Sequence, residues 1–154
     1  MKKINDGQSD GPYELALAAA SSSQPKLEAA RSLLEEAHQN GDPRATYALA
    51  TWCLFGHGGF ELDLKRAVAL LKEASKADIP SAHFDLAVCY EKGSGVRRNN
   101  KLAYRHFLAA SLYGDNDAYG EVGRCLYYGI GIDRDRKAAK IWLRRARMMG
   151  VNIR

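Results

Sequence analysis

The chain repeats itself every 36 or 37 residues. Alanines and glycines return at these intervals in several independent registers. The clearest registers are Ala45, Ala82 and Ala118, then Ala37, Ala74, Ala110 and Ala146, and finally Gly56, Gly93 and Gly129. A fixed period in this range is typical of architectures in which each repeat is one supersecondary unit. The period therefore predicts a stacked helical array and indicates a binding scaffold.

The middle unit shows what each repeat contains. Apolar residues recur at helical spacing through residues 81–92, and residues 93–96 then supply glycines, which readily end helices. Asn99 is placed to cap a second helix, which Gly114 ends. Each hairpin has one apolar side toward its own partner helix and another toward the next hairpin. Because a hairpin cannot bury both sides alone, stacking is obligatory.

Residues of fixed type also mark the ends of the second helices. Good N-cap residues share the register at which each second helix begins: Asp63, Asn99 and Asp135. Residues that tolerate a left-handed conformation follow the second helices: Gly41, Asp78, Gly114 and Gly150. Two prolines then fall in the first turn of the next helix, where a missing N–H costs little: Pro43 and Pro80.

Composition limits the class of protein. The 46% of apolar and 27% of charged residues are typical of a globular chain. No apolar stretch approaches the ~20 residues of a membrane span, and the N-terminal residues lack the apolar core of a secretory signal. Three cysteines without CxxC spacing favour free thiols in a reducing compartment. We therefore expect a cytoplasmic protein that does not bind membranes.

The motifs of three units resemble a known repeat. Residues 86–96 read Leu-Ala-Val-Cys-Tyr-Glu-Lys-Gly-Ser-Gly-Val, and with residues 99–103 they resemble the Sel1-like repeat, a relative of the tetratricopeptide repeat. Residues 122–150 match this pattern again, and residues 49–67 form a third copy with one extra loop residue. The resemblance implies an all-α fold, a right-handed superhelical solenoid of about three and a half stacked antiparallel helix pairs.

The registers divide the chain into units. We expect residues 1–9 to form a mobile arm and residues 10–43 to form a degenerate N-terminal capping repeat. In that repeat, residues 12–20 and 25–41 are the candidate helices. The three full repeats are expected at 44–80, 81–116 and 117–151, followed by a tail at 152–154.

The resemblance also implies a function and a site. Sel1-like proteins mostly act as adaptors for other proteins, and in the related tetratricopeptide fold the first helices line a concave groove. The corresponding positions are Arg44, Tyr47, Thr51, Leu54, Phe55, Ser81, Phe84, Val88, Glu91, Asp117, Gly120, Arg124, Tyr127 and Tyr128. Aromatic residues and Arg are enriched among interface anchors. The alternative is that several of these aromatics fill the space between repeats.

The last helix offers a second surface. Residues 133–154 hold eight Lys or Arg and two Asp, a net charge of +6, so residues 1–132 sum to −1. Four of the cations form one stripe: Lys137, Lys140, Arg144 and Arg147. One interpretation is the polar outer face that a terminal repeat needs for solubility. The other interpretations are a site for an acidic partner or for nucleic acid.

Catalytic and metal-binding patterns are missing from the sequence. The four histidines, His38, His57, His83 and His106, have no His or Cys partner at metal-ligand spacing. We expect no enzyme activity, cofactor, metal or small-molecule substrate. A sharper alternative follows from the family resemblance, because short standalone Sel1-like proteins resemble immunity partners of secreted bacterial toxins. The partner would then be a toxin.

Overall fold

The computed structural model describes residues 10–57 and 59–153, so the predicted arm at residues 1–9 lies outside the described residues. This part of the chain contains helices and no strand. The helices are α1 (Pro12–Ser21), α2 (Leu27–Gln39), α3 (Pro43–Phe55), α4 (Leu64–Ser75), α5 (Pro80–Lys92), α6 (Asn100–Leu112), α7 (Asn116–Tyr128) and α8 (Arg136–Met148). The predicted all-α class is confirmed.

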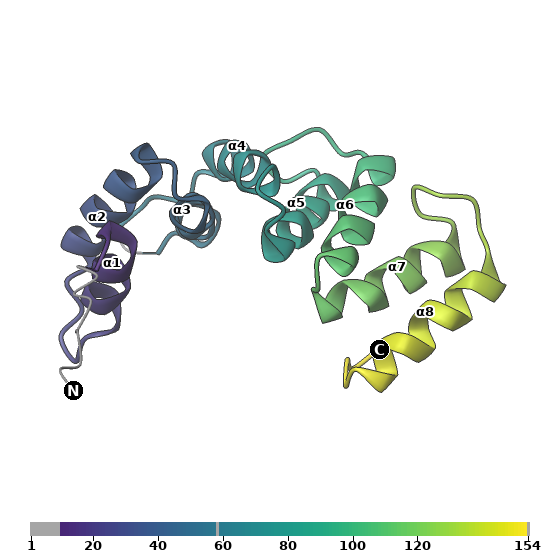
Figure 1. Ribbon diagram of the computed structural model, residues 1–154. Helices are drawn as coiled ribbons and strands as arrows, with labels where there is room; N and C mark the ends of the chain where they lie inside the picture. Colours follow the sequence, from purple (N-terminus) through teal and green to yellow (C-terminus); the bar gives the residue numbers. More distant parts are fainter. Residues whose placement is uncertain (1–9, 58, 154) are drawn as a thin grey trace, which may run out of the picture.

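The helices form an arch of stacked hairpins. Each helix packs against its neighbours in sequence, so that α1 pairs with α2, α3 with α4, α5 with α6 and α7 with α8. The α1–α2 pair and the α7–α8 pair lie at the two ends of the arch (Figure 1). The N-terminal segment, predicted as a degenerate repeat, holds both helices of a pair. Its first helix has 10 residues, against 13 in α3.

Capping residues start the second helices where the sequence predicts. The Asp63 carboxylate accepts a hydrogen bond from the Arg66 N–H at 2.9 Å, and the Asn99 side chain accepts one from the Leu102 N–H at 3.1 Å. Asp135 caps α8 in the same way. The sequence analysis missed two further caps, which start first helices: Asp42 of α3 and Asp115 of α7.

Left-handed residues end the second helices, as predicted. The φ angles are +83° at Gly41, +57° at Asp78, +107° at Gly114 and +79° at Gly150. Asp78 is the only non-glycine residue with positive φ among residues 10–57 and 59–153. Its presence in this register follows from the tolerance of Asp for the left-handed region.

The glycine loops bring consecutive repeats into backbone contact. A Cβ atom on Gly95 would overlap the Leu64 carbonyl group at the start of α4. In the next repeat, a Cβ atom on Gly131 would overlap the Asn100 carbonyl group at the start of α6. In these two loops the second glycine is therefore required, because the loop lies directly on the backbone of the preceding repeat.

The core runs along the whole array and is made mainly of small residues. Alanines on successive helices are fully buried, and larger side chains fill the remaining space. The three cysteines Cys53, Cys89 and Cys125 are unpaired and buried, as expected for small apolar side chains. Within the described ranges, no helix combines the length and apolar character needed to cross a membrane.

Candidate functional site

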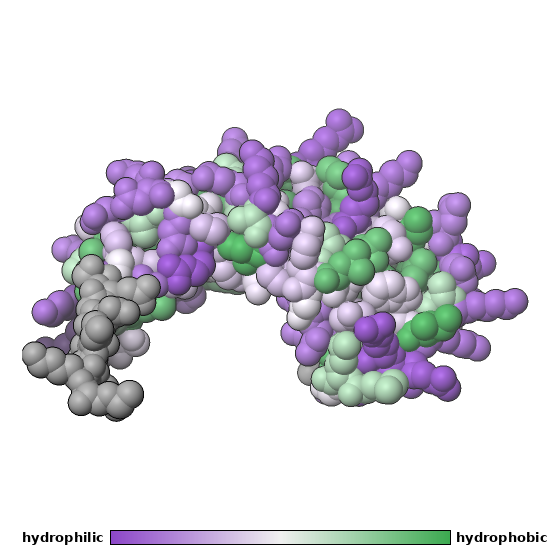
Figure 2. Space-filling view, in the orientation of Figure 1, coloured by the Kyte–Doolittle hydropathy of each residue, from purple (hydrophilic) through white to green (hydrophobic). Residues whose placement is uncertain are grey.

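The inner side of the arch is built from first helices. Figure 1 shows α3 and α5 beneath α4, toward the hollow of the arch, and Figure 2 shows that hollow in the space-filled molecule. Polar contacts join successive first helices across the repeats. Glu14 of α1 pairs with Arg44 of α3 at 2.8 Å, and Glu91 of α5 pairs with Arg124 of α7 at 2.7 Å. The first helices are therefore cross-linked along the array.

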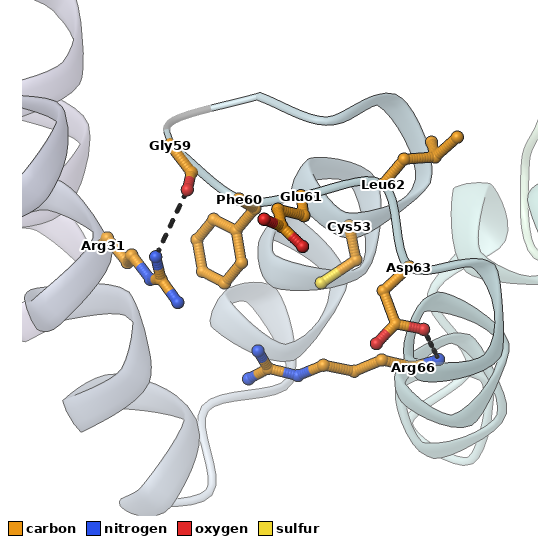
Figure 3. Close-up of a pocket in the computed structure, with 8 residues that line it drawn as sticks. All are labelled: Arg31, Cys53, Gly59, Phe60, Glu61, Leu62, Asp63 and Arg66. Carbon is orange, nitrogen blue, oxygen red and sulfur yellow. Dashed lines mark hydrogen bonds between the residues drawn. The ribbon is translucent and has the colours of Figure 1, made fainter.

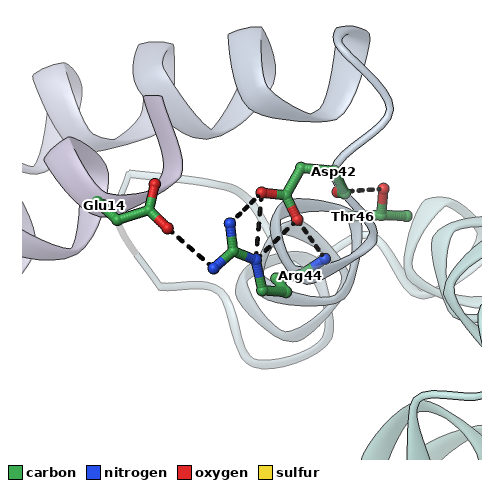
Figure 4. A network of polar contacts seen from close by, with 4 residues as sticks. All are labelled: Glu14, Asp42, Arg44 and Thr46. Atoms are coloured by element: carbon green, nitrogen blue, oxygen red, sulfur yellow. Dashed lines mark hydrogen bonds and ion pairs between the residues drawn. The ribbon is translucent and has the colours of Figure 1, made fainter. Parts of the chain in front are cut away.

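Arg44 is the centre of the first cross-link (Figure 4). Its Nη2 lies 2.6 Å from Asp42 Oδ2 and its Nη1 lies 2.8 Å from Glu14 Oε1. The guanidinium also lies over the Tyr13 ring, 4.3 Å from the ring centroid. The hydrogen bond to Asp42, and then that to Glu14, raise the pKa of Arg44. This predicted groove residue thus ties α3 to α1.

The second cross-link joins α3 to α5 through a phenol and a carboxylate. The Tyr47 hydroxyl donates to Asp85 Oδ2 at 3.0 Å. Burial raises the pKa of both Tyr47 and Asp85. At Asp85, the hydrogen bond from Tyr47 lowers the pKa and so partly opposes the effect of burial. Sequence reasoning selected Tyr47 but missed Asp85, its partner on the next repeat.

The third cross-link is a two-carboxylate clamp on Arg124. The Arg124 Nη2 lies 2.7 Å from Glu91 Oε1 and 2.7 Å from Glu121 Oε2. The hydrogen bonds to Glu91 and Glu121 outweigh the lowering effect of burial, and the pKa of Arg124 is raised. Glu91 and Arg124 were both selected from the sequence, and the structure brings them together.

The predicted apolar groove residues fall into two groups. Five of them pack partly buried against the core: Tyr47, Leu54, Phe84, Val88 and Tyr127. Two are exposed at the ends of first helices, Phe55 at 60% and Tyr128 at 69%. Thr51, also predicted, donates its hydroxyl to the Ala48 carbonyl at 2.8 Å within α3.

Phe84 and Tyr127 show how the half-buried aromatics are held. Phe84 meets Phe107 of its own repeat edge-on, with the ring centroids 5.4 Å apart. The Tyr127 and Tyr128 ring centroids are 4.9 Å apart, and the Arg136 guanidinium lies 5.1 Å from the Tyr127 ring centroid. Each of these rings is thus packed against the core on one side and open to solvent on the other.

One hollow lies between α5, α7 and the residues after α8. Its volume is about 410 Å³, and its lining includes Phe84, Asp117, Gly120, Glu121, Arg124 and residues 151–153. The Val151 and Ile153 side chains approach Gly120, where a Cβ atom would lie 3.7 and 3.9 Å from them. Sequence reasoning missed this contact of the tail with α7.

A second hollow of about 430 Å³ lies between α2 and α4, under the loop that carries the extra residue (Figure 3). The Arg31 guanidinium lies 3.9 Å from the Phe60 ring centroid and donates to the Gly59 carbonyl at 3.4 Å. Arg66 pairs with Glu35 at 2.6 Å. Burial raises the pKa of the neighbouring Cys53 thiol, which keeps it protonated. These contacts fasten the N-terminal pair to the first full repeat.

Two histidines that are far apart in sequence meet inside the third hairpin. His83 Nδ1 and His106 Nδ1 are 3.0 Å apart, and His83 Nε2 is buried without a hydrogen-bond partner. Tyr119 and Trp142 form the equivalent pair in the last hairpin, with ring centroids 5.4 Å apart. Both pairs are separated by 23 residues, which is the signal that could have predicted the contact.

The histidine pair is not part of a larger ligand set. Among the described residues, no group of three or more His, Cys, Asp or Glu side chains is arranged to hold a metal ion. Burial, followed by the charges of His83, Arg105 and Lys72, lowers the pKa of His106 to about 4. Burial also lowers the pKa of His83. Both rings are therefore neutral at physiological pH.

The four cations of the basic stripe are exposed on α8. Lys140, Arg144 and Arg147, together with Leu143, line a shallow hollow of about 240 Å³. Lys137 lies one turn before Lys140 on the same helix. The stripe is thus continuous and open to solvent.

The family model of the Sel1 repeat matches residues 43–79, 80–115 and 116–151. The chain belongs to the Sel1 repeat family. A Sel1 repeat protein from Oxalobacter formigenes is 29% identical, with a TM-score of 0.83 over 93% of this chain and 42% of its own. A protective antigen of uropathogenic Escherichia coli is 26% identical, with a TM-score of 0.86 over 90% of this chain and 30% of its own.

Curated relatives share only part of their length with this Sel1 repeat chain. An uncharacterized protein of Neisseria meningitidis serogroup B is 33% identical over 54% of this chain and 18% of its own. The chitin synthase regulator SKT5 of Saccharomyces cerevisiae is 32% identical over 56% of this chain and 13% of its own. The chain therefore spans less than a fifth of either relative. Sel1 repeat proteins are generally non-catalytic scaffolds for protein interactions.

Proposed function

We propose that this chain is a non-catalytic adaptor that holds a segment of another protein along the inner side of its arch. The observation that carries the proposal is the set of cross-links between successive first helices. Glu14–Arg44, Tyr47–Asp85 and Glu91–Arg124 fix the helices that form this face. A surface that is ordered before binding loses little conformational entropy when a partner docks.

The exposed aromatics supply the anchors for this partner. Phe55 and Tyr128 offer 60% and 69% of their surface to solvent, while Tyr47, Phe84 and Tyr127 form a half-buried floor. Buried aromatic anchors carry much of the binding energy in protein interfaces. The partner would place apolar side chains against these rings, and polar groups beside Asp85 and Arg124.

The test is a capture experiment with three forms of the full chain. The wild type is compared with a Phe55→Ala/Tyr128→Ala variant and with Leu112→Ala as the control. Leu112 is 71% exposed on the second helix α6, so its loss removes apolar surface away from the first helices. Circular dichroism verifies that all three forms are folded.

We expect a stoichiometric partner to be retained by the wild type and the Leu112 control and to be lost by the double variant. Equal capture by all three forms would contradict the inner-face proposal. A secreted toxin as the partner would support the immunity alternative. The proposed compartment is the cytoplasm, in keeping with the unpaired Cys53, Cys89 and Cys125.

A further inference from the structure

The repeat register identifies which residues of a second helix face the following hairpin. In α2, Glu35 pairs with Arg66 of α4, and His38 lies 2.8 Å from Thr46 Oγ1 and 3.9 Å from Glu73 Oε1. The same positions in α6 are Leu108, partly buried, and Ser111, only 1% exposed. These positions therefore lie in the interface between consecutive repeats.

In α8 the interface positions are occupied by the basic stripe. One period after Leu108 and Ser111 come Arg144 and Arg147, and Lys140 comes one period after Tyr104, which is also partly buried against the core. All three are exposed and, with Leu143, line the hollow of about 240 Å³. Residues 151–153 already cover Gly120 on α7. The open part of this end face is thus the α8 surface on which a further hairpin would stack.

The opposite end of the array presents the complementary half of the same interface. Glu73 of α4 faces back toward His38 of α2. The residue one period before Glu73 is Glu36, which is exposed on α2. By its register, Glu36 therefore lies on the N-terminal end face, where its carboxylate would contact a preceding hairpin. In the described residues, no ion pair involves Glu36.

The charges of the two terminal hairpins are opposite. Residues 10–42 contain six carboxylates and two cations, a net charge of −4. Residues 116–153 contain eight cations and four carboxylates, a net charge of +4. Complementary charge of this kind increases the rate and specificity of association between two surfaces.

We propose that copies of this chain associate head to tail, with the α8 end face of one copy on the α1–α2 end face of the next, because each second helix within the chain packs on the following hairpin. Arg147 of one copy takes the position that His38 has within the chain, and Glu36 of the other copy takes the position of Glu73. The contact is heterologous, so it continues from copy to copy unless the superhelical rotation closes a ring. The contact would extend the solenoid from one copy into the next.

The first test is sedimentation velocity of the full chain over a range of concentrations at low and at high salt. We expect the sedimentation coefficient to rise with concentration at low salt. High salt should reverse the rise, because exposed charge pairs are screened. A single monomeric species at all concentrations in low salt would overturn the proposal.

A charge-exchange pair identifies the contact. Arg147→Glu and Glu36→Arg should each give a monomer at concentrations where the wild type associates. An equimolar mixture of the two variants should associate again. In the mixture, the new carboxylate at position 147 meets the new guanidinium at position 36, and the unchanged Arg147 meets the unchanged Glu36. Circular dichroism confirms that the variants are folded. Failure of the mixture to associate would overturn the proposed pairing, whatever the single variants do.

Two controls separate this contact from other occupants of the stripe. Arg134→Glu changes the net charge equally in the exposed loop before α8, and it should leave the association within twofold of the wild type. A gel-shift assay with a short DNA duplex tests the nucleic-acid alternative. A monomeric wild type that binds the duplex and loses it in Arg147→Glu would assign the stripe to nucleic acid and overturn the head-to-tail contact.

Discussion

Single polar residues set the starting points of the helices. Asp135 accepts hydrogen bonds from the N–H groups of Lys137 and Ala138 at 3.0 and 2.9 Å, which would otherwise have no partner in the first turn of α8. The same position holds Asp63 and Asn99 in the other repeats, so the register selects for side chains that accept such bonds. Helix boundaries are thus decided residue by residue.

Asp135→Ala should lower the free energy of unfolding by about 1 kcal/mol, because two N–H groups lose their acceptor. Asp133→Ala is the matched control. Asp133 lies two residues earlier, is exposed and makes no hydrogen bond in the described part of the chain, so the expected change is below about 0.5 kcal/mol. Urea denaturation followed by circular dichroism measures both. Equal effects would show that charge, and not capping, matters at Asp135.

The paired histidines make stability depend on pH. The folded-state pKa of His106 is about 4, below the ordinary value of 6.5, so between these values the unfolded chain binds more protons than the folded one. The stability contributed by neutral His106 is present above pH 6.5 and is lost as pH falls toward 4. Other groups around the pair are Asp78, which lies 4.0 Å from His83 Nε2, and Lys72, Tyr90, Arg105 and Tyr113.

Unfolding free energy should fall by roughly 1–3 kcal/mol more between pH 7 and pH 4.5 in the wild type than in His106→Leu. Leucine is the natural control residue, because Leu70 has this register position in α4 and is buried. Denaturant titrations at several pH values give the comparison. Parallel curves for the two proteins would show that the histidine pair does not report on pH.

Whole elements are joined through backbone contacts that tolerate no side chain. Gly131 has a φ of +71° and lies directly against the Asn100 carbonyl group, so its loop packs the last repeat against the start of α6. Gly150 has a similar φ of +79°, yet a Cβ atom there would meet nothing within 4 Å. A comparison of substitutions at these two glycines therefore separates the free-energy cost of backbone strain from that of a steric clash.

Gly131→Ala should destabilise the protein by about 3 kcal/mol or more, since it combines left-handed strain with an overlap that moves a repeat. Gly150→Ala should cost only about 1 kcal/mol, the value for strain alone. Thermal and urea denaturation of the two variants provide the test. If Gly150→Ala is equally damaging, the close approach at Asn100 contributes nothing.

The whole molecule is a linear array, so stability should vary along it. Burial is greatest in the middle: α5 has six buried residues, α8 has two and α1 has one, Ala16. In arrays where each repeat contacts only its neighbours, the terminal hairpins lose one interface and open more easily.

Hydrogen exchange measured by mass spectrometry should therefore show the slowest amide exchange in α5 and α6 and the fastest in α1, with α8 intermediate. The expected difference between α5 and α1 is at least tenfold in rate, corresponding to about 1.4 kcal/mol in opening free energy. Uniform protection of all eight helices would mean that the array opens as one cooperative unit.

The sequence by itself determined the repeat, the hairpin and the helix ends. Period, apolar spacing, N-cap residues and left-handed residues are local properties of the chain, so Asn99, Asp78 and Gly150 could be assigned without knowing where neighbouring repeats lie. The first-helix register also selected Arg44, Tyr47, Glu91 and Arg124, which the structure places at the cross-links.

Only the tertiary structure decided which side chains meet across repeats. The pairing of Tyr47 with Asp85 and the close approach of Gly131 to Asn100 depend on how far and at what angle one hairpin is displaced from the next. That displacement results from packing of many small side chains between helices, and no single residue or spacing encodes it. The same packing separates exposed Phe55 and Tyr128 from half-buried Phe84.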